Sequence, residues 1–148
     1  MFIVHEELGR GTFLTLYLSA GVFGSLTSLT YYTIARNFNT FSNGASGAIN
    51  GILSAATLLV NPLIFAWTPF RGERVTLPVI EAEVPASALI LWPLLIGLEL
   101  WGLRSGLGKN MDYFAHIGGY AAGTTGTLYW LWHRKDLRKA ETARTERR

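Results

Sequence analysis

The chain has 148 residues, of which 49% are hydrophobic and 16% charged, and its formal net charge is +3. This length suits one domain with a sizeable core. The absence of cysteine excludes disulfides and thiolate metal sites. The histidines, His5, His116 and His133, do not have a metal-ligand spacing, so we expect no metal site.

Residues 1–11 are expected to form a loop that leads into the first long apolar segment. Met1–Gly9 is short and acidic and lacks a basic start, which does not fit a cleavable signal peptide. We therefore expect either that internal helices target the chain or that its true start lies further upstream.

Charged residues are absent from three long segments and nearly absent from a fourth. No Asp, Glu, Lys or Arg occurs in residues 11–35, 37–70 or 113–132, and residues 84–103 contain only Glu99. Each segment is long enough to cross roughly 30 Å of hydrocarbon as a helix. A soluble bundle is the alternative, but soluble helices of this length normally show a polar face.

The sequence therefore predicts an all-α, polytopic membrane protein. Its domain would extend over residues 12–132, with transmembrane helices near 12–34, 45–67, 84–103 and 113–132. The segment 71–83 between the second and third helices is polar. Tryptophans near the helix ends fit an aromatic belt at the membrane interface; these are Trp92, Trp101, Trp130 and Trp132.

The last segment, 133–148, is expected to be a basic, solvent-exposed tail. Most of the Lys and Arg residues lie in this tail, at Arg10 or in the 71–83 segment, which four crossings would place on one side. The positive-inside rule assigns that side to the cytosol or an equivalent compartment such as the matrix. The tail can also meet anionic lipid head groups. We expect no nucleic-acid partner, because acidic residues interrupt the tail and it has no aromatic residue for stacking.

Two short motifs carry the chemistry that we expect of the chain. Gly44-Ala45-Ser46-Gly47 opens the second helix, and His116-Ile117-Gly118-Gly119 lies near the start of the fourth. Polar groups inside a membrane are costly and mark functional sites by default. Since an imidazole can take the proton of a serine hydroxyl, Ser46 is a candidate nucleophile and His116 its candidate general base.

Stripes of small residues follow both motifs and would let the second and fourth helices pack closely. Gly44, Gly47 and Gly51 lie on one helix, and Gly119 and Gly123 on the other. Glycine stripes can also serve packing alone. The N–H groups of Ser46 and Gly47, in the first turn, can stabilise a developing oxyanion.

Two further polar residues have weaker functional interpretations. Asn50 lies one turn after Ser46 and is a possible orienter of the His116 ring, although a bond to the backbone is the simpler reading. For Glu99, snorkelling or pairing with Arg104 explains a lone acidic residue near a helix end.

These residues resemble the rhomboid family of intramembrane serine proteases. Gly44-Ala45-Ser46-Gly47 resembles the family's G-x-S-G nucleophile motif, and Ala115-His116-Ile117-Gly118-Gly119 resembles its histidine helix. The residues that precede this motif, Asp112-Tyr113-Phe114, are similar to those of mitochondrial members of the family. The resemblance covers roughly residues 6 to 132. The family's H-x-x-x-N motif is not matched, because Glu6, Glu7, Leu8 and Gly9 follow His5.

The resemblance implies an intramembrane endopeptidase with a Ser46–His116 dyad and no cofactor. Its substrates would be single-pass transmembrane proteins, cut in or near the bilayer. It also implies a multi-pass protein, with the mitochondrial inner membrane as its location, whose chain begins after the second of six core helices. Two alternatives stay open: an inactive rhomboid-like protein that binds transmembrane helices, and an unrelated four-helix membrane scaffold. The oligomeric state and the natural substrate do not follow from the sequence.

Overall fold

The computed structural model describes residues 2–36, 44–59, 73–78, 82–106 and 111–145. In chain order, these residues form five helices and two strands: α1 (Phe2–Leu8), α2 (Arg10–Ile34), α3 (Gly44–Leu59), β1 (Arg74–Leu77), β2 (Ala82–Pro85), α4 (Ala88–Ser105) and α5 (Tyr113–Thr145). The predicted end of the second helix, near residue 67, lies outside the described residues.

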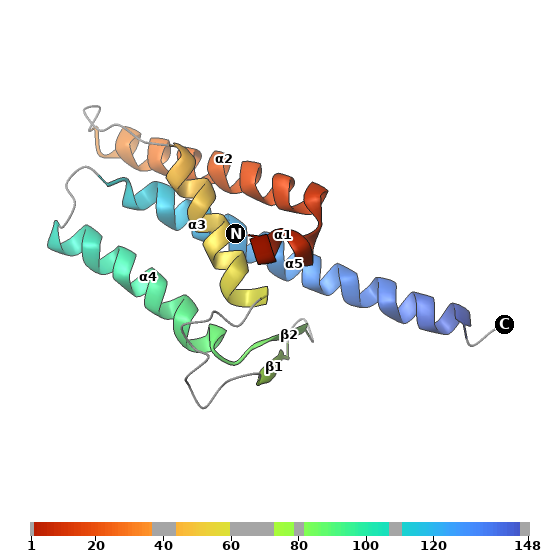
Figure 1. Cartoon of the computed structure of the whole chain (residues 1–148). Coiled ribbons are helices and arrows are strands. Elements are labelled where there is room, and N and C mark those ends of the chain that lie inside the picture. The colour runs from red at the N-terminus through yellow and green to blue at the C-terminus, as the bar shows by residue number, and fades with distance from the viewer. Residues whose placement is uncertain (1, 37–43, 60–72, 79–81, 107–110, 146–148) are drawn as a thin grey trace.

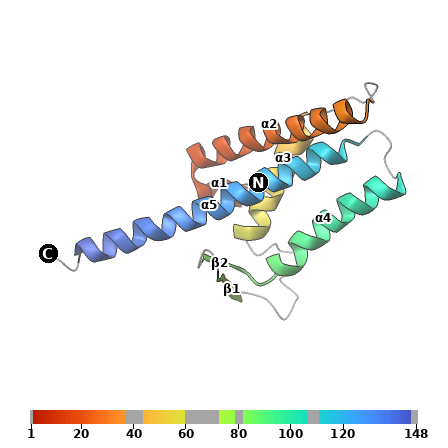
Figure 2. The ribbon, with the colours of Figure 1, turned by 180° about the vertical axis from the view of Figure 1, so that it is seen from behind.

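Helices α2, α3 and α5 form the centre of the molecule. In both views α2 and α5 run alongside each other while α3 crosses them, and α4 lies beyond α5 (Figures 1 and 2). All three central helices contact one another. The predicted segments are apolar throughout, so they form helices whose packed faces are set by small residues rather than by an amphipathic pattern.

The exposed side chains of the long helices indicate whether water or lipid surrounds them. Large apolar side chains are exposed along α2 and α4, among them Leu18 (63%), Leu29 (64%), Ile34 (78%) and Trp101 (60%). Exposed apolar area of this extent would be unfavourable in water. Among the residues that the structure describes, α2 and α4 are long and apolar enough to span a membrane, and α3 contains a shorter apolar segment. The chain is a helical membrane protein, as the sequence predicts.

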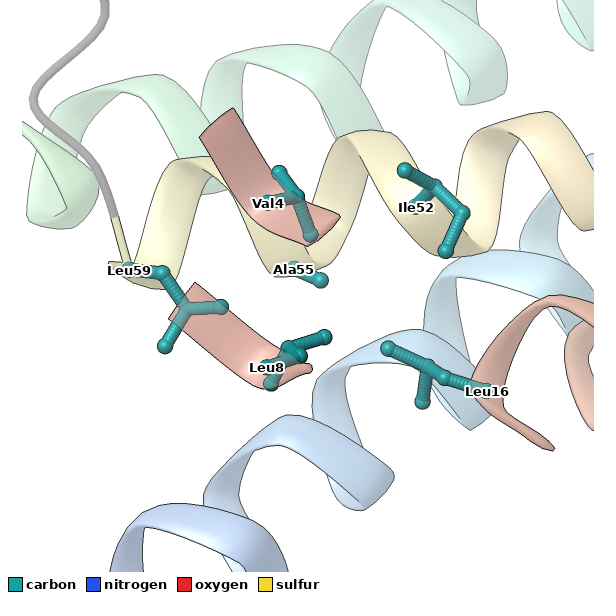
Figure 3. Close-up of a cluster of buried hydrophobic side chains, with 6 residues drawn as sticks. All are labelled: Val4, Leu8, Leu16, Ile52, Ala55 and Leu59. Carbon is teal, nitrogen blue, oxygen red and sulfur yellow. The ribbon is translucent and has the colours of Figure 1, made fainter. Parts of the chain in front are cut away.

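The N-terminal segment differs from the loop that we expected. Phe2–Leu8 forms α1, whose Val4 and Leu8 are buried. They join Leu16 of α2 and Ile52, Ala55 and Leu59 of α3 in one apolar cluster (Figure 3). Gly9 has φ +77° and allows the chain to turn sharply between α1 and α2. The apolar residues of α1 therefore contribute to the core.

The polar segment between α3 and α4 contains an antiparallel hairpin that we did not predict. Arg74 pairs with Pro85, and Leu77 pairs with Ala82. Val84 is buried against Leu58 of α3 and Ala88 of α4. The hairpin thereby covers the ends of α3 and α4 and fixes where α4 begins, at Ala88 rather than near residue 84.

The C-terminal segment is also more ordered than the tail that we expected at 133–148. Helix α5 continues without a break from Tyr113 to Thr145 and extends past the other helices (Figure 1). Arg134 lies 4.8 Å from the centre of the Trp130 ring and 3.6 Å from the Glu7 carboxylate of α1. The basic segment thus begins as a continuation of the helix that carries His116.

Candidate functional site

Ser46 lies in the first turn of α3. The helix begins at Gly44, and the Ser46 side chain is half-buried. The first four N–H groups of a helix have no partner within the helix, and its N-terminus carries a partial positive charge. A nucleophile in this turn has hydrogen-bond donors close by for an oxygen that becomes negatively charged.

His116 lies in the first turn of α5, which a buried aspartate caps. The Asp112 Oδ1 atom accepts the N–H of Ala115 at 3.0 Å, and its Oδ2 atom accepts the Ser28 hydroxyl of α2. Aspartate is a favoured N-cap, because its oxygen satisfies a free helix donor. Asp112 therefore fixes both the start of α5 and its position against α2. From the sequence we named Asp112 only as part of the stretch before the histidine motif and not as a cap, although its place before the helix was a capping signal.

The starts of α3 and α5 touch through their backbones. A Cβ added to Gly47 would lie 3.0 Å from the carbonyl oxygen of Ala115, and one added to Gly119 would lie 3.0 Å from the Gly47 Cα. The residue after Ser46 thus contacts the residue before His116. Only glycine permits this separation at these positions, so Ser46 and His116 lie at one level of two touching helices.

The same close packing continues one turn further along both helices. A Cβ added to Gly123 would lie 2.6 Å from the Gly51 Cα, and one added to Gly51 would lie 3.1 Å from the carbonyl oxygen of Gly119. Helix α2 joins this contact, since a Cβ at Gly24 would lie 2.6 Å from the Ala115 carbonyl oxygen. Four of the glycines that we named as packing residues lie in these contacts: Gly47, Gly51, Gly119 and Gly123.

The partner of the His116 ring is Glu99 of α4. The Glu99 Oε2 atom lies 2.9 Å from His116 Nδ1, and the two side chains are only 16% and 7% exposed. The Tyr113 ring lies 6.1 Å from the imidazole in an edge-on arrangement. Our expectation that Glu99 snorkels or pairs with Arg104 was therefore wrong. Glu99 therefore contacts the His116 ring. The role that we considered for Asn50 stays a prediction.

A polar cluster ties α4 to α3 and α5 further along the bundle. The Trp92 indole N–H donates to the Thr124 hydroxyl at 2.8 Å, and the Ser54 and Thr124 hydroxyl oxygens lie 2.6 Å apart. Trp92 is thus engaged within the bundle, although we expected it in an interfacial belt. The cluster holds α4 beside α5, where Glu99 reaches His116.

An open apolar groove of roughly 470 Å³ lies between α2 and the start of α3, and Ser46 is not one of its lining residues. Residues Tyr17, Leu18, Gly21, Val22, Ser25 and Leu26 of α2 line it, together with Ala45 and Ala48 of α3. Ala45 is the residue directly before Ser46. Within the described part of the chain, no three His, Cys, Asp or Glu residues lie close enough to hold a metal ion.

The fold is a helical membrane bundle in which two glycine-packed helices, α3 and α5, carry a serine and a histidine near their starts. Residues 1–133 match the sequence model of the Rhomboid domain family. The chain belongs to the rhomboid family.

Two curated relatives are similar to nearly the whole chain. Rhomboid protein 1, mitochondrial, from Saccharomyces cerevisiae is 31% identical over 145 residues, which cover 94% of this chain and 36% of the yeast protein. Presenilin-associated rhomboid-like protein A, mitochondrial, from Danio rerio is 32% identical over 126 residues, which cover 85% of this chain and 28% of the zebrafish protein. The chain therefore spans roughly a third of the length of these relatives. No solved structure matches it significantly.

Proposed function

We propose that the chain is an intramembrane serine endopeptidase in which Ser46 is the nucleophile and His116 the general base. The observation that carries the proposal is the backbone contact between Gly47 and Ala115, which holds the two first turns together. Membership of the rhomboid family, a family of intramembrane serine proteases, supports the same chemistry.

The proposed reaction begins with attack of the Ser46 Oγ atom on a peptide carbonyl carbon. His116 takes the hydroxyl proton as the Oγ–C bond forms, and the carbonyl electron pair moves to the oxygen. The N–H groups of Ser46 and Gly47 would stabilise this oxyanion. When the peptide C–N bond breaks, the imidazolium gives its proton to the leaving amine. Water then hydrolyses the ester by the same steps.

The proposed substrate class is a single-pass transmembrane protein, and the apolar groove at the start of α3 supports it. The groove between α2 and α3 is lined mainly by apolar and small side chains and reaches Ala45, so a single-pass transmembrane segment is the ligand that it suits. Close helix approach also needs small residues, which Gly21, Ala45 and Ala48 supply. The bilayer is then the medium that the protein and its substrate share.

The proposed topology has α2, α3, α4 and α5 as membrane crossings, with Arg134 and the later part of α5 on the side rich in basic residues. Both curated relatives are named as mitochondrial, which supports a mitochondrial membrane, and the inner membrane is the location that we propose.

The test is cleavage of a fluorescent single-pass protein by the purified chain in lipid vesicles. We expect a cut in or near the transmembrane segment, and no cut with Ser46→Ala or His116→Ala. Removing either group from a soluble serine protease costs on the order of 10⁶ in kcat. Ser19→Ala is the matched control, because Ser19 is half-buried in α2 and donates to its own helix at Leu16.

Three outcomes separate the hypotheses. Cleavage that survives Ser46→Ala would exclude the proposed nucleophile, and cleavage that survives His116→Ala would mean that another group is the base. A folded wild-type chain that binds the substrate without cutting it would contradict the protease proposal and support a rhomboid-like binding protein.

A further inference from the structure

Glu99 is an ionisable residue that is largely shielded from its surroundings, in a place where a charge is costly. It lies in the apolar helix α4, and its side chain is 16% exposed. Acidic residues inside a membrane are rare and pair with another polar group. Its partner here is His116, at 2.9 Å between Oε2 and Nδ1. The carboxylate therefore contacts one particular nitrogen of the candidate base.

The contact can be compared with two others that join the same pair of helices. Trp92 of α4 donates to Thr124 of α5, and Gly102 of α4 packs against the Tyr113 ring of α5. These contacts join α4 to α5 on either side of Glu99. A carboxylate differs from these contacts, because it influences which nitrogen of the imidazole holds the proton.

We propose that Glu99 is a positioning residue that completes a Glu99–His116–Ser46 relay, an inference that rests on the proposed protease function. A carboxylate only accepts hydrogen bonds. The proton of a neutral His116 ring is therefore held on Nδ1, and Nε2 keeps its lone pair for the serine proton. A carboxylate in this place also stabilises the imidazolium that forms during attack, as the aspartate of a soluble serine protease triad does.

The proton transfers of the proposed relay balance without a further reactant. The Ser46 hydroxyl proton moves to Nε2 as the Oγ–C bond forms, and it later leaves with the amine. The Nδ1 proton stays on Nδ1 throughout and does not pass to Glu99. Glu99 thus acts through His116 and does not touch the substrate.

Two other polar groups near His116 have partners of their own. The Asp112 carboxylate accepts from Ala115 and Ser28, at the cap of α5. The Tyr113 hydroxyl points to the sulfur of Met111, at 3.9 Å. Of the described residues, Glu99 is the one whose carboxylate reaches the imidazole.

The direct test is ¹⁵N magnetic resonance of histidine-labelled protein in lipid bilayers, because the ring-nitrogen shifts report which nitrogen holds the proton. We expect the Nδ1–H form of neutral His116 in the wild type, and a shift toward the Nε2–H form in Glu99→Leu. Glu99→Gln should give a mixture, since an amide both donates and accepts. Trp92→Phe is the control: it removes another α4–α5 contact and should leave the His116 tautomer unchanged.

A wild-type His116 in the Nε2–H form, or an Nδ1–H form that persists in Glu99→Leu, would overturn the proposal. A tautomer that changes equally in Trp92→Phe would do the same, because Glu99 would then be only a tie between helices. This readout requires no catalytic activity.

The rate of labelling by a fluorophosphonate separates this proposal from the protease function. We expect Glu99→Gln to slow labelling by at least about a hundredfold, within the roughly 10⁴ that loss of a triad aspartate costs. Labelling at the wild-type rate in Glu99→Gln would remove the relay and leave the dyad in place. Absence of labelling in the folded wild type, with the expected tautomer change, would remove the protease function and leave the Glu99 contact in place.

Discussion

The contact between Gly123 and Gly51 allows a quantitative test of the packing that holds the site together. A Cβ added at Gly123 would lie 2.6 Å from the Gly51 Cα and 2.7 Å from its carbonyl carbon. Carbon atoms pack at about 3.5–4.0 Å, so Gly123→Ala must separate α3 and α5 by roughly 1 Å. Both contacts are with backbone, which cannot rotate away as a side chain can.

The expected loss of unfolding free energy follows from that displacement of the helices. Overpacking of this kind destabilises by about 1–3 kcal/mol. Gly97→Ala is the matched control, because an added Cβ there meets nothing within 4 Å on α4. In a helix, alanine is favoured over glycine by up to about 1 kcal/mol. Because this preference applies to both variants, they should differ by the overpacking term alone, about 1–3 kcal/mol in unfolding free energy, with Gly123→Ala the less stable.

The assay is unfolding in mixed micelles with increasing dodecyl sulfate, followed by circular dichroism. The same 1 Å shift would separate the starts of α3 and α5, where such a misplacement can slow a reaction about 10²-fold. The labelling rate of Gly123→Ala should therefore fall as well. If Gly123→Ala were as stable as Gly97→Ala, the backbone contact between α3 and α5 would be refuted.

Three further substitutions test other parts of the structure. Asp112→Ala should destabilise by about 1–3 kcal/mol in the same unfolding assay, because it removes a helix cap and a buried hydrogen bond; an unchanged midpoint would contradict the cap. Thr124→Val should cost about 0.6–2 kcal/mol, since it removes the acceptor of the Trp92 indole, and a change in Trp92 fluorescence should accompany it; an unaltered spectrum would argue against that bond. Glu83→Gln should change stability by less than about 1 kcal/mol, because the 3.8 Å pair with Arg74 is exposed; a larger loss would mean that the hairpin depends on this pair.

The glycine pattern explains why much of the bundle could be predicted. Spacing of small residues is a local property of the sequence, and it marks which helix faces can approach closely. Gly47 and Gly51 of α3 do meet Gly119 and Gly123 of α5 in the structure. The membrane class also follows from local composition, because charge-free segments longer than the bilayer is thick have few other folds.

The Glu99–His116 contact could not be predicted in this way. It joins two helices, and its formation depends on how each is rotated about its own axis, which hydropathy does not specify. Arg104 is nearer in sequence, but residues five apart on a helix do not share a face. The engagement of Trp92 within the bundle depends on the same rotation.

The C-terminal end of α5 and the hairpin were not predicted for a different reason. We placed the end of the last helix where the apolar residues stop, near residue 132, but α5 continues to Thr145. Lys, Arg, Ala and Glu are frequent after His133, and all are good helix formers. That signal was present in the sequence, whereas the strands Arg74–Leu77 and Ala82–Pro85 are too short to give a clear one.

We propose that Ser46 is an activated serine, and covalent labelling is the most direct test of that proposal. The purified chain in bilayer discs would be exposed to a fluorophosphonate probe, and the modified residue would be located by peptide mass spectrometry. We predict labelling at Ser46 that is lost in Ser46→Ala and His116→Ala and kept in Ser19→Ala. A folded, helical wild type that takes up no probe, or takes it up at another serine, would contradict the account.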